Sequence, residues 1–165
     1  MKPIPNSIKE RISNAKYYLE AADKHPAPTK DAVHILLLLI GWENIAIADE
    51  ELGAWAKEED VDKQIYKSHA RKFRKMPEVT RIILGSTGTK TREERFSSGK
   101  KFEKLRMVCQ YGSNAETKEV RKLFKSGWHL DSLKNKLVSK IRWIETLVIA
   151  YEELNKRKDA QKITF

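Results

Sequence analysis

The chain has 165 residues, of which 40% are apolar and 34% are charged, and its formal net charge is +10. This length suits a single domain with a sizeable buried core. The single cysteine, Cys109, excludes an internal disulfide and any metal site built from several cysteines. The N-terminus carries no apolar signal segment. We therefore expect one domain over residues 1–165, in the cytoplasm, without cofactor or metal.

The positive charge is concentrated in the middle of the chain. Residues 1–62 hold seven basic and twelve acidic residues, whereas residues 63–106 hold fourteen basic and four acidic ones. Residues 107–165 hold twelve basic and seven acidic residues. This asymmetry indicates an anionic partner such as RNA or another polyanion. The alternative is a solvated, lysine-rich surface of a soluble helical protein.

The first expected helix covers residues 6–24, with Asn6 or Ser7 as its N-terminal cap. Apolar residues recur along it at helical spacing, and the segment HPAP at residues 25–28 ends it, because proline cannot continue a helix. The stripe consists of Ile8, Ile12, Ala15, Leu19 and Ala22.

A central helix is expected from a cap at Thr29 to about Lys57. Its apolar core, residues 35–48, is shorter than the ~20 residues of a membrane span and contains Glu43 and Asn44, so it predicts a buried helix rather than a membrane segment. Gly41 within this helix costs about 1 kcal/mol relative to alanine, which suggests that another helix approaches closely there.

The remaining elements are also expected to be helical. A third helix over residues 61–76 has His69 on its apolar stripe, and a short helix over residues 77–84 precedes the glycine-containing loop 85–91. A stretch opened by a capping box at Thr91 is expected to break at residues 97–99 and then continue. A short helix then runs from Asn114 to Gly127, and a long final helix runs from residue 131 or 132 to about 158, with a frayed tail over 159–165.

No segment shows sustained alternation of apolar and polar residues. The predicted fold is therefore all-α: an antiparallel helical bundle of about five main helices with short accessory helices, built around the central and final helices.

Glu43 and His69 are the strongest candidates for chemistry. Each lies on an apolar face, and a short turn joins their helices, so we expect the two side chains to meet. The pair is interpreted first as a buried structural ion pair and alternatively as an oriented imidazole for acid–base catalysis. Asn44 either extends this network or bonds a neighbouring backbone group. No His or Cys has a partner at metal-ligand spacing, and Cys109 is expected in the core.

Two basic clusters are candidates for phosphate contacts with nucleic acid. One is the run KSHARKFRK at residues 67–75, expected on one helical face, and the other surrounds the loop 85–91. That loop lacks the G-x-x-x-x-G-K-[ST] spacing of an NTPase. The candidate nucleic-acid-binding residues are Lys67, Arg71, Arg74, Lys75, Lys90, Arg92, Arg95, Lys100, Lys101 and Lys104.

Three stretches together resemble the AbiV family of abortive-infection proteins, a branch of bacterial and archaeal phage-defence systems. They are LLLIGWENIAIADEEL at 37–52, an apolar helix ending in an acidic pair; YKSHARK at 66–72, a His followed by Lys; and KLRMVCQYGS at 104–113, an apolar-Arg segment leading to a Tyr turn. The resemblance spans roughly residues 15–151. The family's usual second acidic residue is here Asn44, which departs from a two-carboxylate site.

The AbiV family is similar to the broader HEPN helical-bundle group, many of whose members are metal-independent ribonucleases with an R-x(4–6)-H motif. The nearest pair here, Arg121 and His129, has seven intervening residues. The resemblance thus implies a HEPN-type fold without supporting ribonuclease activity.

Three functions follow as hypotheses. The first is a phage-defence protein that binds RNA or a phage or host protein. The second is a divergent metal-independent ribonuclease in which His69, oriented by Glu43, works beside Arg71. The third is a homodimeric interaction module formed along the final helix, where Trp143 lies off the main apolar stripe.

Overall fold

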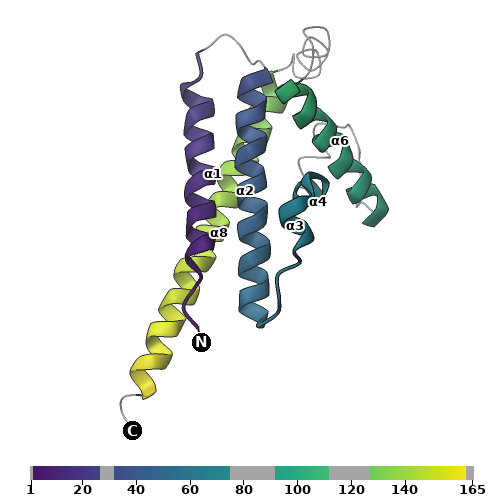
Figure 1. Ribbon diagram of the computed structural model, residues 1–165. Coiled ribbons are helices and arrows are strands. Elements are labelled where there is room, and N and C mark those ends of the chain that lie inside the picture. The colour runs from purple at the N-terminus through teal and green to yellow at the C-terminus, as the bar shows by residue number, and fades with distance from the viewer. Residues whose placement is uncertain (1, 27–31, 75–91, 112–126, 163–165) are drawn as a thin grey trace.

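The computed structural model describes residues 2–26, 32–74, 92–111 and 127–162. These residues contain helices and no strand, which confirms the predicted all-α fold (Figure 1). The helices are α1 (Asn6–Lys24), α2 (Ala32–Lys57), α3 (Gln64–Lys67), α4 (His69–Arg74), α6 (Arg92–Tyr111) and α8 (Gly127–Lys162).

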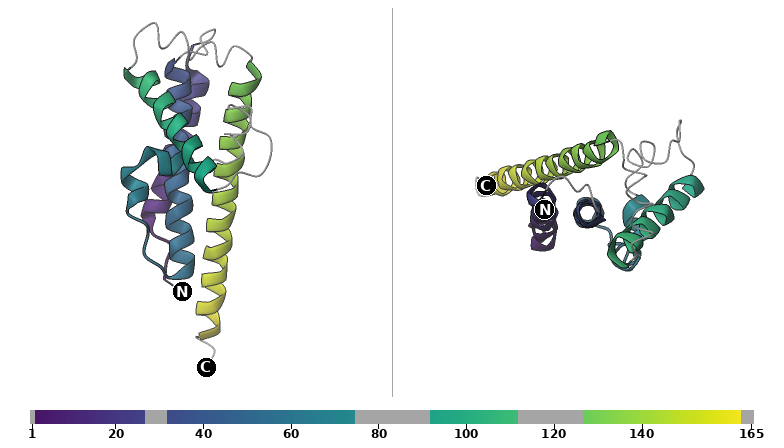
Figure 2. Two further views of the ribbon diagram at one scale, coloured as in Figure 1. Left: turned by 90° about the vertical axis from the view of Figure 1, so that its right-hand side faces the viewer. Right: turned by 90° about the horizontal axis from the view of Figure 1, so that it is seen from above.

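Helix α2 is the centre of the bundle and contacts every other described helix. Helices α1 and α8 lie on one side of it, and α3, α4 and α6 lie on the other (Figures 1 and 2). Helix α1 runs antiparallel to both α2 and α8, whereas α2 and α8 run in the same direction (Figure 1). The predicted bundle around the central and final helices is therefore correct, and its two longest helices form a parallel pair.

The core follows the predicted apolar stripes of the helices. The stripe of α1 is buried apart from Leu19, which is half-buried against the core. The stripe of α8 is buried from Leu133 to Val148 and ends at the half-buried Tyr151, whose ring meets that of Trp55 edge-on. On the other side of α2, Phe73 of α4 packs on Phe102 of α6 with ring centroids 5.7 Å apart. Burial of these large side chains supplies the main driving force for assembly.

Gly41 sits where α1 and α8 both approach α2. A Cβ at this position would lie 3.0 Å from Leu137 Cδ2 and 3.4 Å from the carbonyl oxygen of Ala15. The close helix approach expected from the sequence is confirmed, and it explains why the helix contains a residue with low helix propensity here.

Helix α2 differs from the sequence expectation in one respect, because the whole helix is long enough to cross a membrane. Its 26 residues include a window of mean hydropathy 1.5. Within this structure 67% of that window is buried by the neighbouring helices, as in the core helix of a bundle.

Helix α2 ends at a turn in which Glu58 adopts a left-handed conformation (φ 58°) and the N–H of Glu59 donates to the carbonyl of Ala54.

The expected cap of α1 is wrong, although the helix boundaries are right. Pro5 occupies the N-terminal cap position, and no side chain caps the helix. Asn6 is the first helical residue, and the hydroxyl of Ser7 donates instead to a carboxylate oxygen of Glu51 at 3.0 Å. A long-range bond to a buried acid has therefore replaced the local cap.

The single helix expected over residues 61–76 is also wrong, because the chain breaks at Ser68. Ser68 is extended (φ −110°, ψ 112°) and separates α3 from α4. Its hydroxyl accepts a hydrogen bond from the N–H of Arg71 at 3.3 Å, so Ser68 is the N-cap of α4. Serine favours this role over a helix interior because its hydroxyl competes for backbone donors.

The last two helices are longer than expected. Helix α6 passes through residues 97–99 without the predicted break, and its inward residues include Phe102 and Cys109, both buried as expected. Helix α8 begins at Gly127 rather than after it and extends to Lys162, into the segment expected to fray. The extra last turn, residues 159–162, contains Ala, Gln and Lys, which are strong helix formers. The cap at Thr29, the helix over 77–84, the loop 85–91, the capping box at Thr91 and the helix from Asn114 lie outside the described residues.

Candidate functional site

Three polar side chains of α2 are buried among its apolar residues: Glu43, Asn44 and Glu51. A buried carboxylate requires partners, since isolating it from water is very costly. The structure supplies different partners for each of these side chains, and the partners of Glu43 form the densest group of charges in the interior.

Glu43 is contacted by basic side chains from two other helices. His69 Nδ1 lies 2.9 Å from Oε1, which confirms the contact expected from the sequence. Lys72 Nζ, also on α4, lies 3.6 Å from Oε2, and Arg106 Nε of α6 lies 2.6 Å from Oε1. We call Glu43, His69, Lys72 and Arg106 the Glu43 cluster. It ties α4 and α6 to α2 through one carboxylate.

The Glu43 cluster is buried at its centre and reaches solvent at one edge. The side chains of Glu43 and Lys72 are each 8% exposed, that of Arg106 is 15% exposed, and that of His69 is 31% exposed. His69 is thus the member nearest solvent. With Nδ1 held by the carboxylate, its other ring nitrogen, Nε2, has no hydrogen-bond partner among the described residues. This is the arrangement that orients an imidazole for proton transfer or anion binding.

The buried Glu51 forms a second network, with hydroxyl groups that lie nearer the surface. Tyr66 of α3 donates to Oε1 at 2.8 Å, and Ser7 of α1 donates to Oε2 at 3.0 Å. Burial of the phenol, strengthened by the hydrogen bond to Glu51 and by its negative charge, raises the pKa of Tyr66 to about 12. Tyr66 is therefore a neutral donor over the physiological pH range, which suits a structural link between α1, α2 and α3.

Asn44 bonds its own helix, which is the second of the two roles expected for it. Its side-chain amide donates to the carbonyl of Ile40 at 3.0 Å, and its oxygen accepts from Arg11 of α1 at 3.5 Å. No contact links it to Glu43, so Asn44 fastens α1 to α2 and is not a second member of the Glu43 cluster.

The candidate RNA-contacting residues are only partly placed. Lys67, Lys100 and Lys104 are exposed, and Arg71 is half-buried in an ion pair with Asp62. The break at Ser68 puts Lys67 on a different helix from Arg71, so these two residues do not share one helix. The side chains of Arg74, Arg92, Arg95 and Lys101, and the whole of Lys75 and Lys90, lie outside the described residues.

The sequence missed two important partners. The arginine that meets Glu43 is Arg106, whereas Arg71, which was expected to work beside His69, pairs with Asp62. The acid that meets Tyr66 is Glu51. Arg106 lies four residues after Phe102 and three before Cys109, two inward residues of α6, so its place at the edge of an apolar stripe was the available signal. Glu51 follows Glu43 by eight residues, which leaves it close to the face of α2 that carries Glu43.

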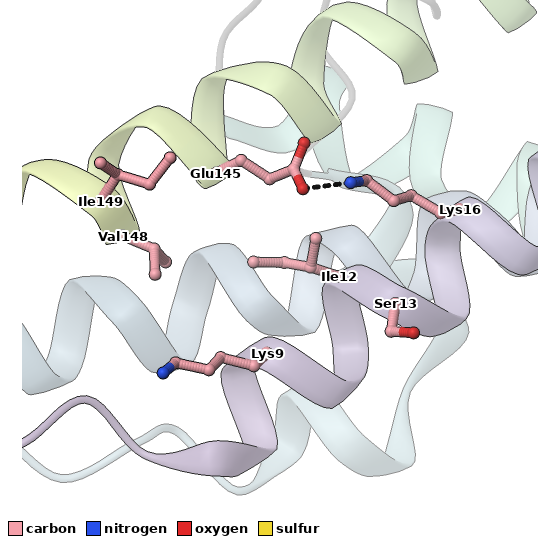
Figure 3. A pocket seen from close by; sticks show the side chains of 7 residues that line it. All are labelled: Lys9, Ile12, Ser13, Lys16, Glu145, Val148 and Ile149. Atoms are coloured by element: carbon pink, nitrogen blue, oxygen red, sulfur yellow. Dashed lines mark ion pairs between the residues drawn. The ribbon is translucent and has the colours of Figure 1, made fainter. Parts of the chain in front are cut away.

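A separate groove of about 250 Å³ lies between α1 and α8 (Figure 3). Its floor is made by Ile12, Val148 and Ile149, and none of the residues that line it belongs to the Glu43 cluster. The two lysines at its rim are engaged by acids of α8: Lys16 pairs with Glu145, and Lys9 with Glu152 at 2.7 Å (Figure 3 draws the first pair). The groove therefore presents no unpaired charge to a ligand.

Among the described residues, no group of three or more His, Cys, Asp and Glu side chains is placed to hold a metal ion. The chemistry available in the Glu43 cluster is instead that of cations held near a carboxylate and a half-exposed imidazole. No family of known proteins, curated protein or solved structure matches this chain.

Proposed function

We propose that this chain is a cytoplasmic phage-defence protein of the abortive-infection type that binds RNA through the side of the bundle formed by α3, α4 and α6. One observation carries the proposal. Glu43 fixes α4 and α6 against α2, so basic segments that are far apart in the sequence lie on the same side of the fold (Figure 1).

The resemblance to AbiV proteins gains support from the same cluster. Each of its three stretches contributes to the Glu43 cluster: Glu43 comes from the first, His69 and Lys72 from the second, and Arg106 from the third. Short motifs that are separated in sequence but meet around one buried group are expected when a pattern records a common structure rather than chance composition.

The charge distribution favours RNA as the partner. The segment from residue 63 to 106, which contains α3, α4 and most of α6, holds fourteen of the basic residues and only four acidic ones. Lys67 and Lys104 are exposed on this side and make no ion pair among the described residues. Exposed lysines of this kind contribute phosphate contacts, which give affinity without sequence specificity.

The test is the salt dependence of RNA binding, measured by fluorescence anisotropy with a labelled single-stranded oligonucleotide. Each phosphate contact adds a slope of about −0.7 to log K against log salt for single strands, so Lys67→Gln and Lys104→Gln should each make the slope shallower by roughly that amount. Lys9→Met removes the same charge from α1 and should leave the slope unchanged. Absence of salt-sensitive binding in the wild type would direct the proposal to a phage or host protein instead.

A second candidate is a divergent metal-independent ribonuclease, favoured by the orientation of His69. Its Nδ1 is held by a buried carboxylate while its ring is partly exposed, as a general acid or base requires. Arg106, rather than Arg71, is the arginine placed to stabilise a charged transition state beside it. RNA cleavage without added metal that is lost in a folded His69→Ala variant would support this candidate, and unchanged cleavage would remove it.

A homodimeric module along α8 is a third candidate. Trp143 is 57% exposed on α8, outside the core stripe of that helix. Light scattering that finds a monomer at high protein concentration would exclude it.

A further inference from the structure

The Glu43 cluster contains more positive than negative charge. Lys72 and Arg106 are both cationic at neutral pH, and Glu43 is the one carboxylate that meets them among the described residues. Even with a neutral imidazole at His69, one positive charge is not compensated by any described residue. A net charge at this depth is costly, because the low-dielectric interior does not solvate it. Among the described residues, this imbalance favours the binding of a second anion.

The hydrogen bonds of the cluster also favour a second anion. The 3.6 Å between Lys72 Nζ and Glu43 Oε2 is too long for a hydrogen bond. Arg106 Nε is fully buried and, although close to Oε1, has no hydrogen-bond partner among the described residues, while its Nη1 donates to Gln110 at 2.7 Å. The guanidinium therefore pairs with the carboxylate as an ion but not through a well-aligned hydrogen bond, and it carries N–H donors beyond these contacts that are suited to a second acceptor.

We propose that the Glu43 cluster is a binding site for one phosphate group, held by Lys72, Arg106 and His69 around the orienting carboxylate of Glu43. Arginine and lysine donors are the usual ligands of phosphate oxygens, and charge-assisted bonds of this kind are about twice as strong as neutral ones. In its imidazolium form, His69 donates from Nδ1 to Glu43 and from Nε2 to the phosphate. The exposed edge at His69 is the side from which the group enters.

This inference deepens the proposed function and rests on it, because the phosphate would belong to the bound RNA. A phosphodiester of the backbone and free inorganic phosphate share the same oxyanion chemistry. The exposed lysines would hold neighbouring phosphates by long-range attraction, whereas the Glu43 cluster would seat one phosphate by direct hydrogen bonds. Binding at the cluster and binding at the surface can therefore be separated by substitution.

The experiment is a titration of the full chain with inorganic phosphate at constant ionic strength, with chloride as the balancing anion, followed by calorimetry and thermal unfolding. Phosphate should bind and raise the Tm of the wild type above its value in chloride. In Lys72→Met the cluster becomes neutral, so the fold should persist while phosphate affinity falls roughly tenfold to a hundredfold, the value of one charge-assisted hydrogen bond. Lys9→Met, which removes an exposed charge from α1, should retain full phosphate affinity.

A second variant keeps the test decisive if Lys72→Met does not fold. Arg106→Lys preserves the charge but removes the forked donors of the guanidinium, and it should weaken phosphate binding while leaving the protein folded. Phosphate that stabilises no more than chloride, or that binds Lys72→Met as tightly as the wild type, overturns the proposal.

RNA-binding measurements on the same variants distinguish failure of this inference from failure of the proposed function. RNA binding that depends on Lys67 and Lys104 but not on Lys72, without any binding of inorganic phosphate, overturns the phosphate site and leaves the RNA-binding function in place. Cluster-dependent binding of inorganic phosphate without RNA binding supports the phosphate site and overturns the RNA-binding function. Loss of both forms of binding in Lys72→Met assigns the site to a backbone phosphodiester.

Discussion

Removal of the Glu43 carboxylate should destabilise the protein far more than removal of a surface carboxylate. In Glu43→Gln the side-chain volume is kept, but Lys72 and Arg106 remain at 8% and 15% exposure with no counter-charge. Leaving a buried ion without its partner costs about 3–5 kcal/mol. For a domain of this size each kcal/mol lowers Tm by roughly 2–4 °C, so we expect a fall on the order of 10 °C.

The matched control is Glu152→Gln on α8. Glu152 pairs with Lys9 at 2.7 Å, but both side chains are exposed, and an ion pair of this kind is worth at most about 1 kcal/mol. Thermal and urea unfolding followed by circular dichroism compare the two variants directly. A Tm for Glu43→Gln within about 2 °C of the control would refute the view that this carboxylate holds α4 and α6 on α2.

A double substitution tests the reason for the loss. If the cost comes from an uncompensated cation, Lys72→Met in the Glu43→Gln background should restore part of the stability. The two substitutions should then deviate from additivity by about 0.5–3 kcal/mol, as groups in one network do. Simple additivity would mean that Glu43 and Lys72 act independently.

Two further predictions concern other parts of α2 and its neighbours. A Cβ at Gly41 would press on Leu137, whereas one at Gly53 would meet nothing within 4 Å, so Gly53→Ala should stabilise the fold by about 0.5–1 kcal/mol and Gly41→Ala should be less stable than Gly53→Ala by about 1–3 kcal/mol in urea unfolding. Tyr66→Phe should cost about 1 kcal/mol below pH 10 because Glu51 loses a donor. Since the pKa of Tyr66 is raised from 10.0 to about 12 in the folded protein, that advantage of the wild type is complete below pH 10 and is lost as the pH rises from 10 to 12. Equal pH dependence of unfolding in the two proteins over that range would contradict the assignment.

The sequence predicted the long helices well because their apolar residues repeat with helical period. The boundaries of α1 and the C-terminal end of α2 agree with expectation, as do the buried stripes of α1 and α8. Two of the predictions that failed depended on the hydrogen bonds of serine side chains. The pattern places Ser68 in a helix interior, yet its hydroxyl caps α4. It gives Ser7 as one of two possible caps of α1, yet the hydroxyl of Ser7 reaches Glu51. Which donor a serine serves depends on tertiary neighbours that a linear pattern does not contain.

In the Glu43 cluster, the contact with His69 could be predicted from the sequence, and the contact with Arg106 could not. A carboxylate on an apolar face demands a partner, and His69 was the nearest candidate along the chain, so their contact followed from sequence. Arg106 is separated from Glu43 by 63 positions, and its role depends on α6 packing against both α2 and α4. Such long-range placement follows from the three-dimensional arrangement and not from spacing.

The polar residues of α2 also decide how its neighbours are aligned along it. Apolar Leu, Ile and Ala side chains repeat along α2, so a neighbouring helix displaced by one turn would still find an apolar surface to cover. The same displacement would separate Glu51 from Ser7 and Tyr66, or Glu43 from Lys72 and Arg106, and leave buried charges unpaired. These contacts therefore fix the position of α1, α3, α4 and α6 along the axis of α2.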